Sequence, residues 1–228
     1  MQAQAKSFPD PLPLDPMPLA EAWLRAAWEA KVQRNPNSMV LATTDAGGRP
    51  AARVVLCKEI VTDPGYLVFY TNYESRKGRE LAAQPWAAVV FHWDAMHRQL
   101  RVEGPVVRSP ERESDDYFAS RPWQSRLAAI ASAQSEPIAS RDELLGKLHD
   151  TAARLGSPDP FAPGNVGTDV RLPRPQGWGG YRLWAAAVEL WVEGEYRLHD
   201  RIRWTRELKS TGGTQTQSRP WQHERLQP

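Results

Sequence analysis

The residues best suited to chemistry lie near the C-terminal end, in the run Arg197-Leu198-His199-Asp200-Arg201. Side chains of a β-strand alternate between its two faces, so a strand here would place Arg197, His199 and Arg201 on one face. Two guanidinium groups beside an imidazole are typical of a site that binds an anion and handles a proton. The alternative is a solvated strand face whose charge is partly balanced by Asp200.

Tyr117, Arg121 and Ser125 form a second candidate group. Pro122 disfavours helical backbone at the preceding residue, so we expect a helix to end at Arg121 and Ser125 to cap the next helix, residues 126–133. A helix N-terminus with a neighbouring arginine and hydroxyl groups is suited to binding phosphate. An ordinary helix–turn–helix with a serine cap is the alternative.

Two further segments carry cations. Ser75-Arg76-Lys77 follows Tyr70-Thr71-Asn72 where a predicted strand passes into a helix, and its backbone amides and two cations are suited to phosphate. A solvated basic helix start is the alternative. Arg53 and Lys58 flank an otherwise apolar strand, and their odd separation places them on opposite faces of an ideal strand. Both reach one site only if a bulge or a subunit interface intervenes.

Composition limits the classes of function. The 228 residues are 41% hydrophobic and 25% charged, which is ordinary for a globular domain with a substantial core. A net charge of +2 argues against a nucleic-acid partner but is compatible with small anions. Cys57 is the only cysteine, which excludes a disulfide framework and a cysteine-rich zinc site and favours the reducing cytoplasm. His92 and His97 lack the spacing of metal ligands on a helix, so no metal is expected.

The elements that must position these residues are mostly short strands. Repeated prolines predict a flexible arm over residues 1–15, followed by a single domain over residues 16–228. Residues 1–18 contain no apolar run, so we expect neither a secretory signal nor a membrane span there. Apolar residues at helical spacing predict a helix over 19–30. Turn residues then separate five predicted strands that favour a small barrel or meander: 39–44, 51–58, 66–71, 86–93 and 99–108.

Helices interrupt this β pattern, and strands resume near the end of the chain. Helices are predicted over 75–84, from Ser109-Pro110 to Arg121, and from a capping box at Ser140 to about Leu155. Proline and glycine predict a mobile loop over 156–177. Later strands are predicted over 181–191, 197–204 and 221–226, with a polar loop over 209–218. The expected fold class is mainly β with flanking helices (α+β).

Taken in order, these segments resemble the pyridoxamine 5′-phosphate oxidase family, and the resemblance covers nearly everything after residue 15. Each piece is short, but the ordered set is highly specific. The matching stretches are Arg53-Val54-Val55-Leu56-Cys57-Lys58, Phe69-Tyr70-Thr71-Asn72, Ser75-Arg76-Lys77, Arg98-Gln99, Tyr117-Phe118-Ala119-Ser120-Arg121-Pro122, Gln134-Ser135, Trp178-Gly179-Gly180-Tyr181, Arg197-Leu198-His199-Asp200-Arg201 and Arg225-Leu226-Gln227-Pro228.

The resemblance implies an FMN-binding split β-barrel and a homodimer with FMN bound between the subunits. It also implies which residues touch each molecule. Substrate contacts are implied for Lys58, Tyr117, Arg121, Ser125, Arg197 and His199. FMN contacts are implied for Arg53, Val54, Val55, Leu56, Cys57, Lys58, Tyr70, Thr71, Arg76, Lys77, Gln99, Gln134, Ser135, Trp191 and Arg201.

The activity implied is oxidation of pyridoxamine or pyridoxine 5′-phosphate to pyridoxal 5′-phosphate. A hydride passes from the substrate to FMN, and dioxygen reoxidises the flavin and forms hydrogen peroxide. The amine substrate also yields ammonia through hydrolysis of an imine. Arg197 and His199 are the implied catalytic residues, over the pyridine ring and its reacting carbon.

Two other functions compete with this one. An FMN-dependent oxidase of a phenazine precursor has the same fold, but its substrate carries no phosphate, so Tyr117, Arg121 and Ser125 argue against it. A non-catalytic protein that binds flavin or pyridoxal phosphate would have no use for Arg197 and His199. The chain also departs from the family pattern at Val192, where a glutamine commonly follows the tryptophan, and in two long loops, 156–177 and 209–218.

Overall fold

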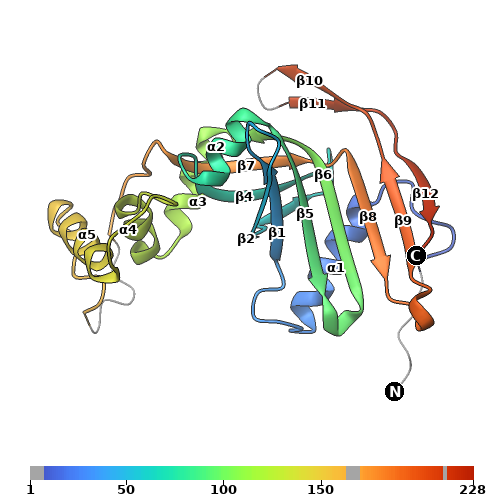
Figure 1. Cartoon of the computed structure of the whole chain (residues 1–228), viewed down its shortest axis with the longest axis horizontal. Helices are drawn as coiled ribbons and strands as arrows, with labels where there is room; N and C mark the ends of the chain where they lie inside the picture. Colours follow the sequence, from blue (N-terminus) through green and yellow to red (C-terminus); the bar gives the residue numbers. More distant parts are fainter. Residues whose placement is uncertain (1–7, 163–169, 213–214) are drawn as a thin grey trace.

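The computed structural model describes residues 8–162, 170–212 and 215–228, and it is mainly β with helices at the edges, as predicted (Figure 1). The helices are α1 (Met17–Glu29), α2 (Arg76–Ala83), α3 (Glu111–Ser120), α4 (Trp123–Ala131) and α5 (Arg141–Arg154), with short 3-10 turns η1 (Asp94–Met96) and η2 (Glu195–Arg197). The strands are β1 (Ser38–Thr44), β2 (Pro50–Leu56), β3 (Glu59–Val61), β4 (Tyr66–Asn72), β5 (Trp86–Trp93), β6 (Arg98–Arg108), β7 (Trp178–Trp184), β8 (Ala187–Val192), β9 (Asp200–Thr205), β10 (Leu208–Gly212), β11 (Gln215–Ser218) and β12 (Gln222–Leu226).

Strand pairing is antiparallel throughout the main sheet, whose longest path runs β12-β9-β8-β6-β5-β1-β2. The long strand β6 has two partners on the same edge: its first half pairs with β8 and its last residues pair with β7. Gly104 lies between the two halves, and a Cβ there would come within 1.9 Å of the Trp184 carbonyl oxygen. Because β7 also pairs with β4, the sheet curls back on itself into a half-barrel.

The core lies on one face of this curled sheet. Burial alternates along β1 and β5, so Leu41, Phe91 and Trp93 are fully buried. Helix α1 covers the same face with Ala20 and Trp23. The opposite face stays open at β1 and β2, and Val40 and Val54 are 41% and 65% exposed. Exposed apolar residues on an uncovered sheet face indicate a surface that packs against another molecule.

A second, smaller cluster joins α4 and α5. Trp123 and Leu127 of α4 pack with Ala152 of α5 and with Leu172, all less than 10% exposed. In Figure 1 these two helices lie beside α3, away from the strands. Leu172 belongs to the segment predicted as a mobile loop; residues 163–169 of that segment lie outside the described residues.

The described part of the N-terminal arm packs on the domain. Phe8 is buried and stacks on Trp23, with ring centroids 5.9 Å apart. The indole Nε1 of Trp204 donates a hydrogen bond of 3.0 Å to the Pro13 carbonyl. Residues 8–15 form no helix or strand, in keeping with their prolines. The boundary at residue 15 stays a prediction.

Serine side chains cap the helices α2 and α5 at the positions where the sequence predicts that these helices begin. Ser75 caps α2 by accepting a hydrogen bond from the Gly78 N–H, and Ser140 caps α5 by accepting one of 3.0 Å from the Glu143 N–H. The Glu143 carboxylate accepts a hydrogen bond of 3.2 Å from the Ala139 N–H, one residue before the N–H of the cap that a capping box would use.

One strand prediction and one loop prediction were wrong in this part of the chain. The predicted strand 181–191 is two strands, because the chain bends at Ala185 and Ala186, whose N–H groups donate to Gly65 and Glu103 instead of continuing the ladder. The predicted polar loop 209–218 is a hairpin of β10 and β11 with an irregular register at its tip. The sequence of these two strands is almost entirely polar, so it has no alternation of apolar and polar residues that would indicate strands.

Candidate active site

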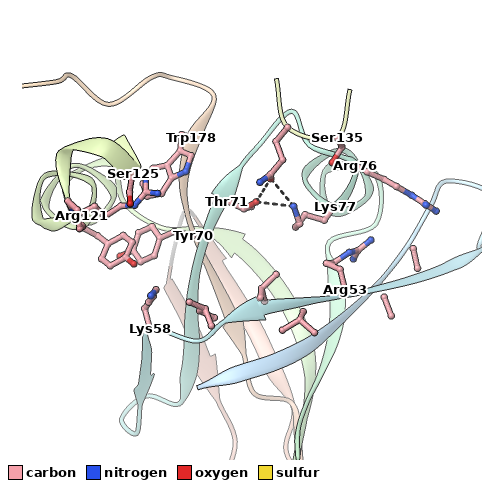
Figure 2. Close-up of a pocket in the computed structure, with 18 residues that line it drawn as sticks. Arg53, Lys58, Tyr70, Thr71, Arg76, Lys77, Arg121, Ser125, Ser135 and Trp178 are labelled. Carbon is pink, nitrogen blue, oxygen red and sulfur yellow. Dashed lines mark hydrogen bonds between the residues drawn. The ribbon is translucent and has the colours of Figure 1, made fainter. Parts of the chain in front are cut away.

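A pocket of about 790 Å³ opens beside the N-terminus of α2, between β2, β4 and the α3–α4 connection (Figure 2). Five cationic side chains line it, and none of the described lining residues is acidic. Figure 2 shows two groups, with Arg121, Ser125 and Trp178 on one side and Arg53, Arg76 and Lys77 on the other. The lining residues are Ala51, Ala52, Arg53, Val54, Val55, Leu56, Lys58, Tyr70, Thr71, Arg76, Lys77, Tyr117, Arg121, Pro122, Ser125, Gln134, Ser135 and Trp178.

Arg53 and Lys58 line this one pocket together, so the prediction that they need a bulge or a subunit interface to meet was wrong. Strand β2 ends at Leu56, and Lys58 lies outside it in the link to β3. The Lys58 N–H donates to the Val68 carbonyl at 2.8 Å, which turns the chain toward β4. Alternation therefore stops before Lys58, and the odd separation no longer decides which way its side chain points.

Stacked aromatic rings form one wall. The rings of Tyr70 and Tyr117 stack with centroids 3.9 Å apart, and Trp178 lies 5.6 Å from Tyr70 with nearly parallel planes. Gly180 pairs with Tyr70 across β4 and β7, and a Cβ on it would come within 2.8 Å of the Tyr70 ring. The glycine is thus required for the ring to occupy this place. Burial raises the pKa of Tyr70 to about 12, so its hydroxyl stays protonated at neutral pH.

Lys77 is buried at the first turn of α2. Its ammonium group donates hydrogen bonds to Thr71 Oγ1 at 3.1 Å, Ser75 Oγ at 3.2 Å and Gln134 Oε1 at 2.9 Å. Burial and repulsion from Arg53 lower the pKa of Lys77 to about 8. A partly desolvated ammonium beside a helix N-terminus gains strongly from an anionic ligand.

Arg121 lies where Pro122 was predicted to place it, in extended backbone directly after α3. Its guanidinium carbon is 4.9 Å from the ring centroid of Trp178. Among the described residues no group accepts a hydrogen bond from its buried Nη1, and burial lowers the pKa of Arg121. A buried N–H donor without an acceptor is costly, and a bound anion would supply the acceptor.

Ser125 lines the same pocket, but not as the predicted cap. Helix α4 already begins at Trp123 after Pro122, so Ser125 is its third residue and donates its N–H to the Pro122 carbonyl at 2.9 Å. Pro122 starts the helix because proline is favoured at the beginning of a helix and resists any other position in it.

The remaining predicted site residues lie elsewhere in the chain. Gln99, Trp191 and Arg201 occupy one row across β6, β8 and β9, on one face of the sheet. Arg201 donates to Glu189 Oε1 at 2.8 Å and to the Gln227 carbonyl at 3.0 Å. None of the three lines the pocket.

Arg197 and His199 do not lie on a strand with Arg201, so that prediction was wrong. Strand β9 begins at Asp200, and Arg197 ends the turn η2 with a left-handed φ of 65°. The His199 ring lies 4.6 Å from the Trp191 ring, and its Nδ1 accepts a hydrogen bond of 3.3 Å from the Gly194 N–H. His199 is thereby placed beside Trp191 and Arg201 rather than beside Arg121.

Several features of the site differ from the sequence reading. Cys57 is buried and does not line the pocket; burial raises its thiol pKa to about 12. Trp178, Ala51 and Ala52 line the pocket, although no ligand contact was predicted for them from the sequence. Trp178 could have been found from the sequence, since it precedes two glycines at the start of a strand.

Among the described residues no group of His, Cys, Asp and Glu could hold a metal, and no described helix is long and apolar enough to cross a membrane.

Comparison with protein families gives two matches. The family described as pyridoxamine 5′-phosphate oxidase matches residues 24–153. The region described as the pyridoxine 5′-phosphate oxidase C-terminal dimerisation region matches residues 178–228. Together they contain the pocket and the row of residues on β6, β8 and β9.

Individual relatives agree with these matches. A pyridoxine/pyridoxamine 5′-phosphate oxidase of Paraburkholderia phytofirmans is 44% identical over 208 residues, which cover 91% of this chain and 86% of the relative. One of Burkholderia mallei is 43% identical over 221 residues, covering 96% and 92%.

Solved structures share the fold. PhzG from Burkholderia lata 383, in complex with tetrahydrophenazine-1-carboxylic acid, superposes with a TM-score of 0.80 at 32% identity and covers 97% of this chain and 98% of that chain. A pyridoxamine 5′-phosphate oxidase-related, FMN binding protein from Nostoc punctiforme superposes with a TM-score of 0.65 at 19% identity, covering 92% and 97%. The expected split-barrel fold with a dimerisation region is confirmed.

Proposed function

The chain belongs to the pyridoxamine 5′-phosphate oxidase family, and on that premise we propose that it oxidises pyridoxamine or pyridoxine 5′-phosphate to pyridoxal 5′-phosphate with FMN and dioxygen. Hydrogen peroxide is the second product, and the amine also yields ammonia. The lone, buried Cys57 supports a place for this reaction in the reducing cytoplasm.

The observation that carries the proposal is the pair of cationic groups in one pocket whose described lining residues include no acid. Arg53, Arg76 and Lys77 lie at one end, where α2 begins, and Lys58 and Arg121 lie at the other. Two separated groups of this kind suit two phosphorylated molecules bound side by side, such as FMN and a pyridine phosphate. The aromatic wall between them suits flat rings.

FMN fits the group at α2. The residues that would hold its phosphate are Arg76 and Lys77, and Arg53, Thr71 and Gln134 would hold further polar atoms. When bound there, FMN supplies the hydride acceptor of the reaction. The chain's own part is to fix the ligand and to present the Lys77 ammonium, whose charged form a bound phosphate would stabilise.

The substrate phosphate would lie at the other end. Arg121 has a buried donor without an acceptor among the described residues, and Ser125 and Tyr117 add hydroxyl groups next to it. The Lys58 ammonium is 5.6 Å from the Tyr117 ring centroid, so it faces the same space. A dianion there receives charge-assisted hydrogen bonds.

The proposed site is completed by a second copy of the chain. Arg197, His199, Arg201, Gln99 and Trp191 do not line the pocket of their own chain, although the reaction needs a proton-handling group near the substrate. A match to a dimerisation region over 178–228 and the open sheet face at Val40 and Val54 support this arrangement. Arg197 and His199 of one subunit would then act on the substrate held by Arg121 of the other.

The likeness to PhzG favours one competing function, oxidation of a tetrahydrophenazine-type substrate by the same fold. The molecule bound by PhzG carries a carboxylate but no phosphate, so Arg121 would face a monoanion rather than a phosphate dianion. The two functions therefore differ in what they require of Arg121.

The test is Arg121→Ala in the flavin-loaded protein. Arg76 and Lys77 remain, so flavin content should stay normal, while the Michaelis constant for pyridoxamine 5′-phosphate should rise roughly 10- to 150-fold, the equivalent of about 1.5–3 kcal/mol for a lost charged hydrogen bond. Unphosphorylated pyridoxamine should be hardly affected. Equal losses for both substrates, at one ionic strength, would show that Arg121 does not bind the phosphate and would favour the phenazine-type reaction.

A further inference from the structure

One buried carboxylate lies directly behind the cationic wall of the pocket. Glu80, in the second turn of α2, has a side chain only 5% exposed, and it is not among the residues that line the pocket. A buried carboxylate is costly unless it is paired and fully hydrogen-bonded. The bonds it makes therefore matter for what it does.

Glu80 is bonded to both pocket arginines at once. Its Oε2 accepts a hydrogen bond from Arg53 Nη2 at 2.8 Å, and its Oε1 accepts one from Arg76 Nε at 2.8 Å. Thr43 completes the arrangement, because its hydroxyl bonds to Glu80 Oε2 and accepts from Arg53 Nη1. Burial raises the pKa of Glu80, but the bonds from Thr43, Arg53 and Arg76 outweigh it, so the pKa lies below its usual value and the group is ionised at neutral pH.

The two arginines differ in how much other support they have. Arg53 is 20% exposed and is held by Thr43 and the Leu41 carbonyl as well as by Glu80. Arg76 is 62% exposed, and Glu80 is the one partner that the structure gives its guanidinium within the described part of the chain. Without Glu80 the Arg76 side chain would lose its anchor, and Arg53, Arg76 and Lys77 would repel one another with no buried counter-charge.

We propose that Glu80 is a positioning residue, whose carboxylate holds Arg53 and Arg76 with their free N–H groups toward the pocket so that an anion binds without rearrangement. The preorganised donors then bind the anion at little entropic cost. The proposal rests on the proposed function for its choice of probe, FMN, but not for its geometry.

Whether Glu80→Gln weakens or strengthens anion binding distinguishes a positioning role from a purely electrostatic effect of the carboxylate charge. Glu80→Gln keeps the shape of the side chain and one good acceptor but removes the charge, so one arginine loses its partner. If Glu80 acted only through its charge, removing a negative group behind the wall would tighten anion binding. If it positions the arginines, binding weakens, and it weakens for the phosphate rather than for the flavin ring.

The experiment measures the affinities of FMN and riboflavin, which differ by the phosphate, for the apoprotein dimer of the wild type and of Glu80→Gln. We expect the preference for FMN over riboflavin to fall at least about tenfold in the variant, while riboflavin affinity changes little. Glu113→Gln is the matched control: Glu113 pairs with Arg182 outside the pocket, so its loss should leave the preference unchanged.

Each outcome decides between alternatives. An unchanged or increased preference for FMN in folded Glu80→Gln overturns the proposal, and so does an equal loss of both ligands, which indicates a merely structural role. If Glu80→Gln does not fold, Thr43→Val keeps the carboxylate, loses the bridging hydroxyl and must still lower the preference by a smaller factor. A wild type that binds neither ligand contradicts the proposed function instead.

Discussion

Raising the pH from 7 to 9 should weaken FMN binding through a single group, Lys77. Its ammonium is held by Thr71, Ser75 and Gln134, and burial with repulsion from Arg53 lowers its pKa from 10.5 to about 8. The free protein therefore loses the Lys77 charge within a range where most proteins remain folded. Since a phosphate dianion favours the charged form, binding takes up a proton above pH 8.

The magnitude follows from the fraction of Lys77 that is protonated. With a pKa of about 8 this fraction is roughly nine-tenths at pH 7 and one-tenth at pH 9, so FMN affinity should fall about tenfold, or about 1.4 kcal/mol. Folding responds in the opposite direction. The pKa of Lys77 is lower in the folded than in the unfolded chain, so the unfolded chain binds more protons between pH 8 and 10.5, and this group's contribution to stability rises with pH there.

Titration of the apoprotein with FMN at pH 7, 8 and 9, followed by quenching of flavin fluorescence, measures the effect. Lys77→Met and riboflavin are the controls, because the first lacks the titrating group and the second lacks the phosphate; both should show no such decline. Tyr70 does not interfere, since its pKa is about 12. A wild-type affinity that is equal at pH 7 and 9, or an equal decline in Lys77→Met, would refute the reasoning.

Two further predictions concern the second copy of the chain. Under the proposed function, Arg197 and His199 would contact the reacting carbon rather than the flavin, so Arg197→Ala and His199→Ala should each lower turnover roughly 10²-fold or more while FMN stays bound. Wild-type rates in steady-state kinetics would contradict these roles. Dilution of the dimer to monomer should release flavin if residues of both copies complete the site, as proposed, and sedimentation that shows a fully flavin-loaded monomer would exclude a shared site.

Much of the fold could be predicted because its signals are local. Short apolar runs between turn residues predict strands such as β1 and β5, and Ser75 and Ser140 mark the starts of their helices as side-chain caps. The break at Arg121 was predictable for the same reason, since Pro122 acts on its immediate neighbour. These effects need only a few residues of context.

The errors lie where distant contacts or unusual backbone override local pattern. Left-handed backbone at Tyr196 and Arg197 ends any strand before His199, yet neither residue type is one that favours such φ values. Lys58 escapes strand alternation because its N–H bonds to β4 rather than to β1. Arg76 precedes Glu80 by four residues on the same helix, but nothing in the sequence places Arg53 beside them, because Arg53 comes from a strand far away in the chain.

The pairing of β6 with both β7 and β8 has a consequence for folding during synthesis. Residues 24–153 are matched as one family region and 178–228 as another, but β4 and β6 of the first both hydrogen-bond to β7 of the second. A nascent chain that has reached only α5 would expose the edges of β4 and β6 as unpaired, apolar strands, which are the usual starting points of aggregation. The half-barrel can close only after residue 184 has left the ribosome. Truncated chains that end between residues 153 and 178 should therefore aggregate instead of folding into a soluble domain.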